Sequence, residues 1–479
     1  MKFLIFAENS RQPYLHYHYR NTAANELRRR INQAGYEAEI IEWIRHWKAS
    51  DLIKIIDLYF LNEANPIIAV SSTFDMGNTD LHFLNNIFKY AKEKYKNLKI
   101  IHGGNRIYTK LQHNPYVDVE FLGRSMGMFD DWIRNKDISK YKKAEINGTL
   151  VLGNSNIDKI VDNPITLTLN DKDCLDKHDV LGFEMAVGCR FNCPFCNYEL
   201  RGSKTILLND SKRLKDFFDE AYNKYGVENF YAIDDTINES EEKLEALYMA
   251  MEGLNFKPKI TAYARLDLLG KDYQREYFKK IHFSSLWFGI ESFNPEVSKQ
   301  VRKKSSLDSV FDNLVYIRNN CPDTFTIGSF IIGLNGDNFE SIDQGFQRVY
   351  EENLLDSLQI FDLSMGNTLM EAGDILSELT KNPEKFGYKV YRDPQSKIIW
   401  ESDWTNNVEA AQLRAMLYNK WSKKFFMITH SEGASFKAMN LLKKNVLVDS
   451  EILKSKALIL SNMYKQEYIK RKKALFNLL

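Results

Sequence analysis

The chain has 479 residues, which is longer than one hydrophobic core usually supports, so we expect two or three domains. Its 44% hydrophobic and 27% charged residues are typical of a soluble globular protein. The 65 basic and 64 acidic side chains nearly cancel, which gives no support for binding to nucleic acid or membranes through overall charge.

The N-terminus turns polar after a short apolar run, which is too brief for the core of a signal peptide. No later segment approaches the ~20 apolar residues of a membrane-spanning helix, so we expect a cytoplasmic protein without a membrane partner. Five cysteines in such a chain do not make a disulfide scaffold, and reduced thiols indicate metal ligands or core packing. We interpret the isolated Cys174 and Cys321 as packing residues.

The first part of the chain alternates predicted buried strands with helices. The strands fall at residues 2–8, 37–43, 65–73, 98–104 and 117–123. Helices of this length between strands indicate a parallel sheet covered on both faces. In such a sheet the ligand crevice lies beyond the carboxyl ends of the strands, which here carry Glu8, Asn9, Ser71, Ser72, Gly103, Gly104 and Gly123.

A second series of strands and helices follows a charged, weakly periodic connector. Its strands are predicted at residues 180–188, 229–236, 259–267, 284–292, 324–334 and 357–365. Six strands with intervening helices indicate a partial (β/α)6 TIM-type barrel, whose chemistry sits at the C-terminal ends of the strands. From about residue 400 the pattern becomes helical.

Three of the five cysteines lie within the segment EMAVGCRFNCPFCNYEL, at Cys189, Cys193 and Cys196. This segment follows a predicted barrel strand, at the catalytic rim. Three thiolates there can hold three corners of a [4Fe–4S] cluster and leave the fourth iron open to a small molecule. The alternative metal is zinc, with Cys174 as the fourth ligand of a structural site. In that case the chain is a zinc-clipped binding protein without turnover.

The pattern Cys189-x3-Cys193-x-Phe195-Cys196 resembles the radical S-adenosylmethionine (SAM) superfamily. Three later segments extend the resemblance over residues 181–368: FYAIDDTIN, LWFGIESFNPEVSKQVRKKS and IGSFIIGLNGDN. They are similar to the second-, fourth- and fifth-strand motifs of the branch that includes methylthiotransferases and cobalamin-dependent members.

The resemblance implies that the three cysteines ligate the cluster, while the amino and carboxylate groups of SAM bind the fourth iron. Phe195 would lie against the adenine. The methionine amino group would be received near Asp234 or Asp235, where this sequence has AIDDT in place of the commoner Gly-Gly-Glu. Both aspartates also suit the N-cap of a following helix.

Further roles follow from the same resemblance. Glu291 and Ser292 would face the ribose and carboxylate region of SAM, and the backbone of Ile332 and Gly333 would meet the adenine edge. Arg265 would pair with the SAM carboxylate, because a guanidinium binds a carboxylate through two hydrogen bonds. The alternative is that Arg265 only bridges neighbouring barrel strands.

A parallel α/β domain ahead of the barrel commonly binds cobalamin in this family, and residues 100–124 resemble part of that domain. We therefore expect an α/β protein with a Rossmann-like, cobalamin-binding-like domain over residues 1–135 and a linker over 136–175. The barrel would span residues 176–385, and a mostly helical region 386–479.

Cobalamin would contact the strand ends of the first domain, at Ser71, Ser72, Gly103 and Gly104. The sequence departs from the family there, because Arg124 replaces the usual acidic residue and no D-x-H-x-x-G motif is present. His16 and His18 are interpreted as exposed loop residues. His102 either touches the ligand or is a structural strand-end histidine.

In this family a reduced cluster passes one electron to SAM, and the resulting 5′-deoxyadenosyl radical abstracts hydrogen from an unreactive carbon. With cobalamin, the expected reaction is methylation of that carbon; without it, carbon–sulfur bond formation, rearrangement or oxidation. The substrate would be a small molecule or a peptide, and the electron donor a flavodoxin or ferredoxin. The basic segment KRKK, residues 470–473, is interpreted as a solvated helix face rather than a nucleic-acid site.

Overall fold

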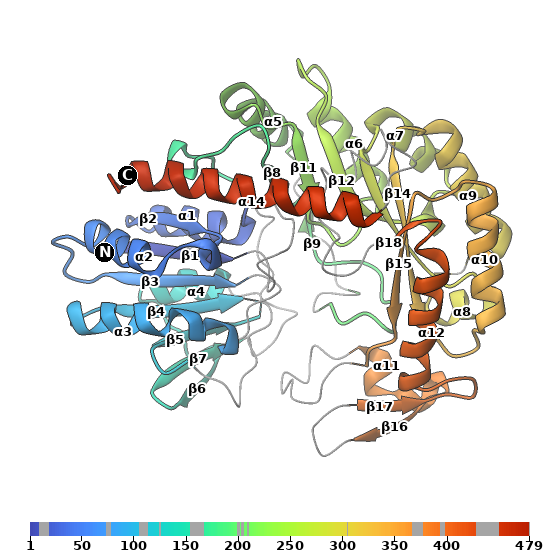
Figure 1. Ribbon diagram of the computed structural model, residues 1–479, viewed down its shortest axis with the longest axis horizontal. Coiled ribbons are helices and arrows are strands. Elements are labelled where there is room, and N and C mark those ends of the chain that lie inside the picture. The colour runs from blue at the N-terminus through green and yellow to red at the C-terminus, as the bar shows by residue number, and fades with distance from the viewer. Residues whose placement is uncertain are drawn as a thin grey trace. The chain divides into compact units, whose positions relative to one another are not determined.

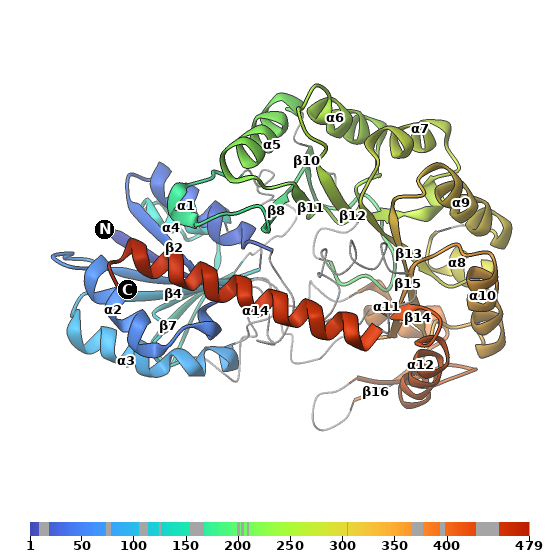
Figure 2. The ribbon, with the colours of Figure 1, turned by 45° about the horizontal axis from the view of Figure 1, so that its top comes forward.

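The computed structural model divides into two compact units (Figures 1 and 2). The first contains Met1–Phe183, Glu220–Glu228 and Lys456–Leu479, and the second contains Glu184–Asp219 and Asn229–Ser455. In the part of the chain that the structure describes, no helix is long and apolar enough to cross a membrane. The described residues are 1–8, 19–72, 78–104, 114–123, 126–153, 167–198, 202, 206–207, 210–303, 305–365, 377–392, 398–427 and 450–478.

The first unit is built on a seven-stranded sheet with the order β2-β1-β3-β4-β5-β7-β6. All neighbouring strands are parallel except the last pair, β7 and β6. The strands are β1 (Lys2–Glu8), β2 (Glu37–Glu42), β3 (Ile67–Ser72), β4 (Lys99–Gly104), β5 (Val119–Leu122), β6 (Lys142–Ile146) and β7 (Thr149–Gly153). This order confirms the predicted parallel α/β fold of the N-terminal region.

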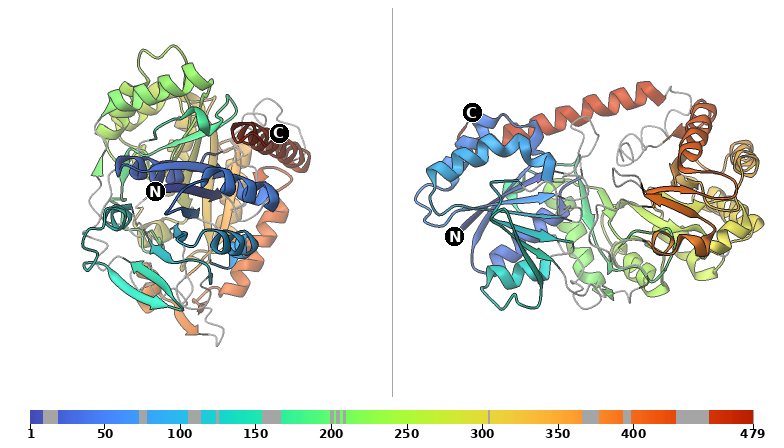
Figure 3. Two further views of the ribbon diagram at one scale, coloured as in Figure 1. Left: turned by 90° about the vertical axis from the view of Figure 1, so that its left-hand side faces the viewer. Right: turned by 90° about the horizontal axis from the view of Figure 1, so that it is seen from below.

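Helices cover both faces of this sheet, as Figure 3 shows. The alternation along β1 sends Leu4 and Phe6 into one core and Phe3 and Ile5 into the other. The first core is closed by α2 (Ala49–Tyr59) and α3 (Asn85–Lys94), and the second by α1 (Thr22–Gln33) and α4 (Met126–Ile133). Apolar residues on both faces of each strand explain why the strands read as continuous hydrophobic runs.

The strands β6 and β7 lie inside residues 136–175, which the sequence analysis interpreted as a linker. They form an antiparallel hairpin that extends the first sheet through the pairing of β7 with β5. The turn is Asn147–Gly148, with φ angles of 51° and 84°, as a tight hairpin turn requires. The charged outer strand, KKAEI, made this segment look like a connector, yet charged side chains are common on an edge strand.

The C-terminal part of α14 (Ser450–Leu475) belongs to the first unit. Tyr468 and Ile469 enter its core, and Lys472 is fully buried in an ion pair with Glu39. Lys473 pairs with Asp51 at 2.6 Å. The interpretation of residues 470–473 as a solvated helix face was therefore wrong, because two of these lysines neutralise carboxylates of the first unit.

The second unit is built on parallel strands that neighbour one another in chain order, β11-β12-β13-β14-β15-β18. These are β11 (Asn229–Ala232), β12 (Lys259–Arg265), β13 (Ser285–Glu291), β14 (Phe325–Ile332), β15 (Ser357–Asp362) and β18 (Phe426–Met427). The helices between them are α6 (Glu241–Met251), α7 (Asp272–Ile281), α8 (Pro295–Gln300), α9 (Leu307–Asn320), α10 (Phe339–Glu351) and α12 (Asn407–Trp421). Figure 2 shows α6, α7, α9 and α10 along one side of the sheet, as in the predicted partial barrel.

Shorter elements complete the chain. The strand β8 (Val180–Phe183) precedes the cysteine segment, and β9 (Ala186–Val187) pairs with β10 (Ile206–Leu207). The helix α5 (Ser211–Tyr225) precedes β11, and α11 (Glu378–Lys381) precedes the hairpin of β16 (Lys389–Arg392) and β17 (Ile398–Glu401). Beyond residue 386, the described residues thus contain α12 and α14 together with this hairpin and β18.

Capping side chains start the helices that follow the ends of the barrel strands. Asn294, Ser306 and Asn338 accept hydrogen bonds from backbone N–H groups in the first turns of α8, α9 and α10. Such caps end the preceding loops at defined points. The loops after β13 and β14 are therefore short and end at a capped helix.

Candidate functional site

The three cysteines lie in a loop that begins directly after β9. The backbone N–H of Cys196 donates to the carbonyl of Cys193 at 3.1 Å, which closes a tight turn between them. Other elements of the second unit fix the same loop: the N–H of Leu379 donates to Pro194 O at 2.9 Å, and Arg302 Nη1 donates to Asn192 O at 2.7 Å. The loop is thus held by α11 and by the segment after α8.

The thiol groups occupy a partly desolvated position. Cys189, Cys193 and Cys196 are half-buried and form no disulfide. Burial raises the pKa of Cys189 and raises the pKa of Cys196 to about 12. Thiolates are poorly stabilised in such surroundings unless a metal or a cation compensates their charge, so this donor set suits a metal centre.

The zinc alternative needs four protein ligands around one ion. Among the described residues, no three His, Cys, Asp or Glu side chains gather as the ligands of one metal ion do. In a cluster each thiolate binds a different iron, so the sulfurs lie farther apart than around one ion. Cys174, the fourth ligand of the zinc alternative, packs against the core of the first unit and donates to Lys172 O at 3.6 Å. The zinc alternative gains no support.

Asp234 is part of a buried ion network at the end of β11. Its carboxylate accepts the backbone N–H of Met185 at 3.0 Å and pairs with Lys243 Nζ at 2.7 Å. Lys243 Nζ also contacts Glu239 at 3.0 Å and donates to Thr236 O at 2.9 Å. Because Met185 stands four residues before Cys189, this network fixes the start of the cysteine loop.

Asp235 differs from Asp234 in its surroundings. Its side chain is exposed, and its negative charge contributes to the raised pKa of Cys189 and Cys196, after burial. Of the two aspartates, Asp235 is therefore the one whose charge acts on the cysteine loop. Neither aspartate is an N-cap, because Ser240 caps α6, so that alternative was wrong.

Arg265, the last residue of β12, reaches the cysteine loop. Its Nε and Nη2 donate to the two carboxylate oxygens of Asp267 at 2.9 and 2.7 Å, and Nη1 donates to Cys193 Sγ at 3.5 Å. The guanidinium stacks on the ring of Phe191 with 4.0 Å to the centroid. The bidentate edge of the guanidinium, formed by Nε and Nη2, therefore binds Asp267. The sequence analysis had assigned such a two-hydrogen-bond contact to the SAM carboxylate.

Glu291 ends β13 with a left-handed backbone, at a φ of 70°. This conformation is uncommon for a residue with a side chain and is found preferentially at functional sites. The carboxylate is nearly buried and pairs with Lys303 Nζ at 2.9 Å. The neighbouring Ser292 is buried, and its hydroxyl accepts the N–H of Asn294 at 2.9 Å.

Gly333 follows β14, and only glycine fits there. Its φ is +104°, and a Cβ atom would lie 2.6 Å from the ring of Trp400. Its carbonyl accepts a hydrogen bond from the Tyr388 hydroxyl at 2.9 Å.

Phe195, the predicted adenine neighbour, is half-buried in the cysteine loop. The cysteine loop contacts Arg265 at the end of β12, the segment just before the loop contacts Asp234 after β11, and the ends of the parallel strands β13 and β14 lie at the same edge of the sheet.

In the first unit the predicted residues lie at the carboxyl ends of adjacent strands. Ser71 pairs with Gly103 across β3 and β4, and Gly103 and Gly104 are half-buried. His102 is fully buried, 4.0 Å from Glu120, which agrees with the structural interpretation of this histidine. Four of the predicted positions lie outside the described residues: Asn9, His16, His18 and Arg124.

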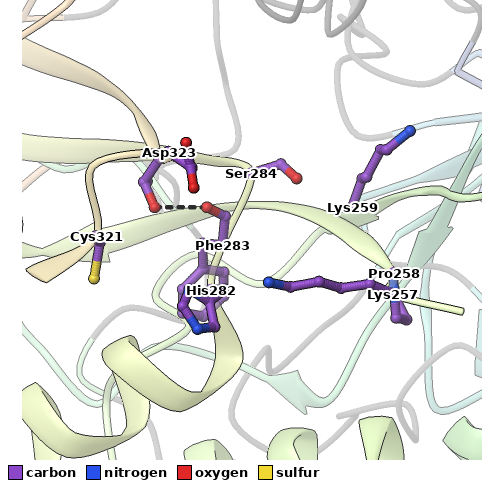
Figure 4. A pocket seen from close by; sticks show the side chains of 9 residues that line it. Lys257, Pro258, Lys259, His282, Phe283, Ser284, Cys321 and Asp323 are labelled. Carbon is purple, nitrogen blue, oxygen red and sulfur yellow. Dashed lines mark hydrogen bonds between the residues drawn. The ribbon is translucent and has the colours of Figure 1, made fainter.

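A shallow pocket of about 190 Å³ lies at the opposite ends of the barrel strands (Figure 4). It is lined by Lys257, Lys259, His282 and Asp323, among others, near the starts of β12, β13 and β14. The pocket is therefore separate from the rim that carries the cysteines. Chemistry in barrels of this type takes place at the C-terminal ends of the strands.

Comparison with known proteins gives the family of the barrel. Residues 183–348 match the model of the Radical SAM superfamily. The chain carries a radical SAM domain. This family uses a [4Fe–4S] cluster and SAM, and the three cysteines and the rim described above belong to this radical SAM domain. No curated protein matches this chain.

Solved structures show where else this fold occurs. The radical SAM methyltransferase TsrM from Kitasatospora setae, solved with cobalamin and a [4Fe–4S] cluster, is similar at a TM-score of 0.62 and 10% identity, over 99% of both chains. The cobalamin-dependent radical SAM enzyme OxsB, solved with aqua-cobalamin and SAM, gives a TM-score of 0.59 and 12% identity, over 97% of this chain and 71% of OxsB. Residues 183–348 thus match a radical SAM domain, and the chain as a whole has the fold of these two proteins.

Sequence reasoning missed the residues that hold the site together. Lys243, Asp267, Arg302 and Lys303 contact Asp234, Arg265, the cysteine loop and Glu291, respectively. Lys303 and Arg302 stand in the segment VRKKS, which the resemblance had matched without giving these two residues a role. Nothing in the sequence around Lys243 distinguishes it from a surface lysine.

Proposed function

We propose that the protein is a cobalamin-dependent radical SAM methyltransferase that acts on an unactivated carbon of a small molecule or peptide. The observation that carries the proposal is one chain with both a radical SAM domain and a separate parallel sheet of order β2-β1-β3-β4-β5. When bound, the cluster and SAM supply a radical able to abstract hydrogen, and cobalamin supplies a transferable methyl group. A flavodoxin or ferredoxin is the proposed electron donor.

The sheet of the first unit offers a suitable place for a flat cofactor. In this strand order the direction of winding reverses between β1 and β3, and ligands bind beyond the carboxyl ends at that point. Ser71, on β3, borders this point, and Gly103 lies beside it on β4; the small size of both residues lets a ligand approach the backbone. Glu8 ends β1 at the same edge and accepts the N–H of Arg45 at 3.2 Å.

Cobalamin retention tests this part of the proposal. We expect the protein, after incubation with hydroxocobalamin and desalting, to retain about one corrin per chain by absorbance. Replacing Gly103 and Gly104 by valine should lower retention at least tenfold, because branched side chains would fill the strand end. Gly153→Val is the matched control. Gly153 ends β7 at the same edge of the sheet, and a Cβ atom added there would lie 3.8 Å from the nearest non-neighbouring atom, in the side chain of Leu122.

The outcomes are distinct. Equal retention by Gly103→Val/Gly104→Val and by Gly153→Val would contradict binding at this strand end. If the wild-type protein retains no corrin but still cleaves SAM, it is a cobalamin-free radical SAM enzyme. The reaction would then be carbon–sulfur bond formation, rearrangement or oxidation.

Within the radical SAM domain, the chain's own residues bind and orient SAM. We propose that Asp235 receives the methionine amino group, because its side chain is exposed and its charge acts on Cys189 and Cys196. Glu291 and Ser292 would contact the ribose and carboxylate region, and Phe195 and Gly333 would border the adenine. The cysteines would hold the cluster through three thiolates.

Replacing Glu291 tests the SAM contact. We expect Glu291→Ala to keep its iron, because the cysteines are unchanged, but to bind SAM with roughly five- to hundredfold lower affinity, since a lost buried polar contact is worth ~1–3 kcal/mol. SAM affinity is measured by equilibrium dialysis of the reconstituted protein. Lys303→Met breaks the same ion pair from the other side. Equal losses in both variants would show that the ion pair, rather than contact with SAM, explains the effect.

A further inference from the structure

The guanidinium of Arg265 contacts Cys193, one of the three cysteines assigned to the cluster. Its Nη1 donates to Cys193 Sγ at 3.5 Å, while Asp267 takes the opposite side of the group. Cys196 Sγ accepts a hydrogen bond from the backbone N–H of Tyr198 at 3.4 Å, whereas the donor to Cys193 Sγ is a charged side chain. A charge-assisted bond to a thiolate is stronger than one from a neutral donor.

Several contacts fix the guanidinium in this position. Phe191 stacks against one face at 4.0 Å, and Nη2 also donates to the carbonyl of Arg302 at 3.3 Å. The side chain of Arg265 is only 7% exposed, so its charge is little screened by water. Arg302 in turn donates hydrogen bonds to Asn192 O in the cysteine loop and to the Glu378 carboxylate in α11. The network around Arg265 is thus connected to both the loop and α11.

We propose that Arg265 tunes the reduction potential of the cluster by donating a hydrogen bond to the Cys193 thiolate. Reduction adds one negative charge to the cluster. A nearby cation therefore stabilises the reduced form more than the oxidised form and raises the potential, as hydrogen bonds to cluster sulfurs are known to do. This role rests on the proposed cluster at Cys189, Cys193 and Cys196.

Asp267 sets the strength of this effect. Its carboxylate pairs with Arg265 at 2.7 Å and partly cancels the positive charge that the thiolate experiences. Removing the arginine charge and removing the aspartate charge should therefore shift the potential in opposite directions. A general loosening of the loop would not produce such a pair of shifts.

The midpoint potential of the reconstituted cluster, measured by an electrochemical titration followed by electron paramagnetic resonance, tests the proposal. We expect Arg265→Gln to make reduction about tenfold less favourable, a shift of ~59 mV to more negative potential for a one-electron couple. Asp267→Asn should shift the potential to more positive values. Arg190→Gln is the matched control, because this exposed arginine follows Cys189 but donates to Glu239 O at 3.1 Å instead of to a thiol.

The outcomes distinguish a failure of the proposed function from a failure of the role proposed for Arg265. A wild-type protein without a cluster would overturn the proposed function before Arg265 is tested. The role of Arg265 would be overturned if both variants hold a cluster with the wild-type midpoint potential. It would also be overturned if Arg265→Gln and Asp267→Asn shift the potential in the same direction. If Arg265→Gln holds no cluster, Asp267→Asn decides alone: a positive shift supports the proposal and any other result contradicts it.

Discussion

Replacement of Cys189, Cys193 and Cys196 by alanine is expected to abolish both iron binding and the formation of 5′-deoxyadenosine from SAM. The three thiols lie in one loop of the radical SAM domain and are the side chains proposed to bind the cluster. Without a cluster there is no site for SAM or for the electron that cleaves it. Iron analysis and chromatography of the SAM products, both under anaerobic conditions, measure the two losses.

The remaining two cysteines provide the matched control. Cys174 packs against the core of the first unit, and Cys321 is buried with its thiol donating to Phe278 O at 3.7 Å. A variant with Cys174→Ala and Cys321→Ala should therefore keep its iron and its SAM cleavage. Retained 5′-deoxyadenosine formation in the triple variant, or lost iron in the double variant, would contradict the assignment of the ligands.

Lys243→Met is expected to cause the largest loss of stability among single substitutions in the radical SAM domain. The ammonium group is buried and bridges Asp234 and Glu239 at 2.7 and 3.0 Å. Methionine keeps the packing of the chain but leaves two buried carboxylates without their cation, which costs about 3–5 kcal/mol. The free energy of unfolding of the metal-free protein is measured by urea denaturation.

The same substitution should also reduce cluster loading. Asp234 accepts the N–H of Met185, so a displaced Asp234 releases the start of the cysteine loop. Lys280→Met is the control: Lys280 pairs with Glu276 four residues earlier, but it is exposed on α7, where water and salt screen such a pair and it contributes little to stability. A loss below about 1 kcal/mol in Lys243→Met would show that the buried network is not needed for stability.

The strands and the cysteine loop could be predicted because their signals are local. Buried runs such as KFLIFAE and the C-x3-C-x2-C spacing can be recognised within a few residues. The β6–β7 hairpin also had a local signal, the Asn147–Gly148 turn, but its polar outer strand masked it.

The ion networks around the site could not be predicted in the same way. Lys243 and Lys472 have the sequence surroundings of surface lysines, and both are almost fully buried. Glu39, the partner of Lys472, lies 433 residues away along the chain. Asp234 and Glu239, the partners of Lys243, are close in the sequence, but the sequence does not show that they are buried. Which charges are buried is decided by tertiary packing, which a single sequence does not display. The contact of Arg265 with Cys193 is of the same kind, because 72 residues separate the two.

The iron and acid-labile sulfide content of the anaerobically reconstituted wild-type protein tests the radical SAM assignment most directly. A [4Fe–4S] cluster on three cysteines predicts about four irons and about four sulfides per chain, with a brown colour that is lost in air. Both values should fall to background in the triple cysteine variant. One zinc per chain, with no sulfide and no colour, would contradict the assignment.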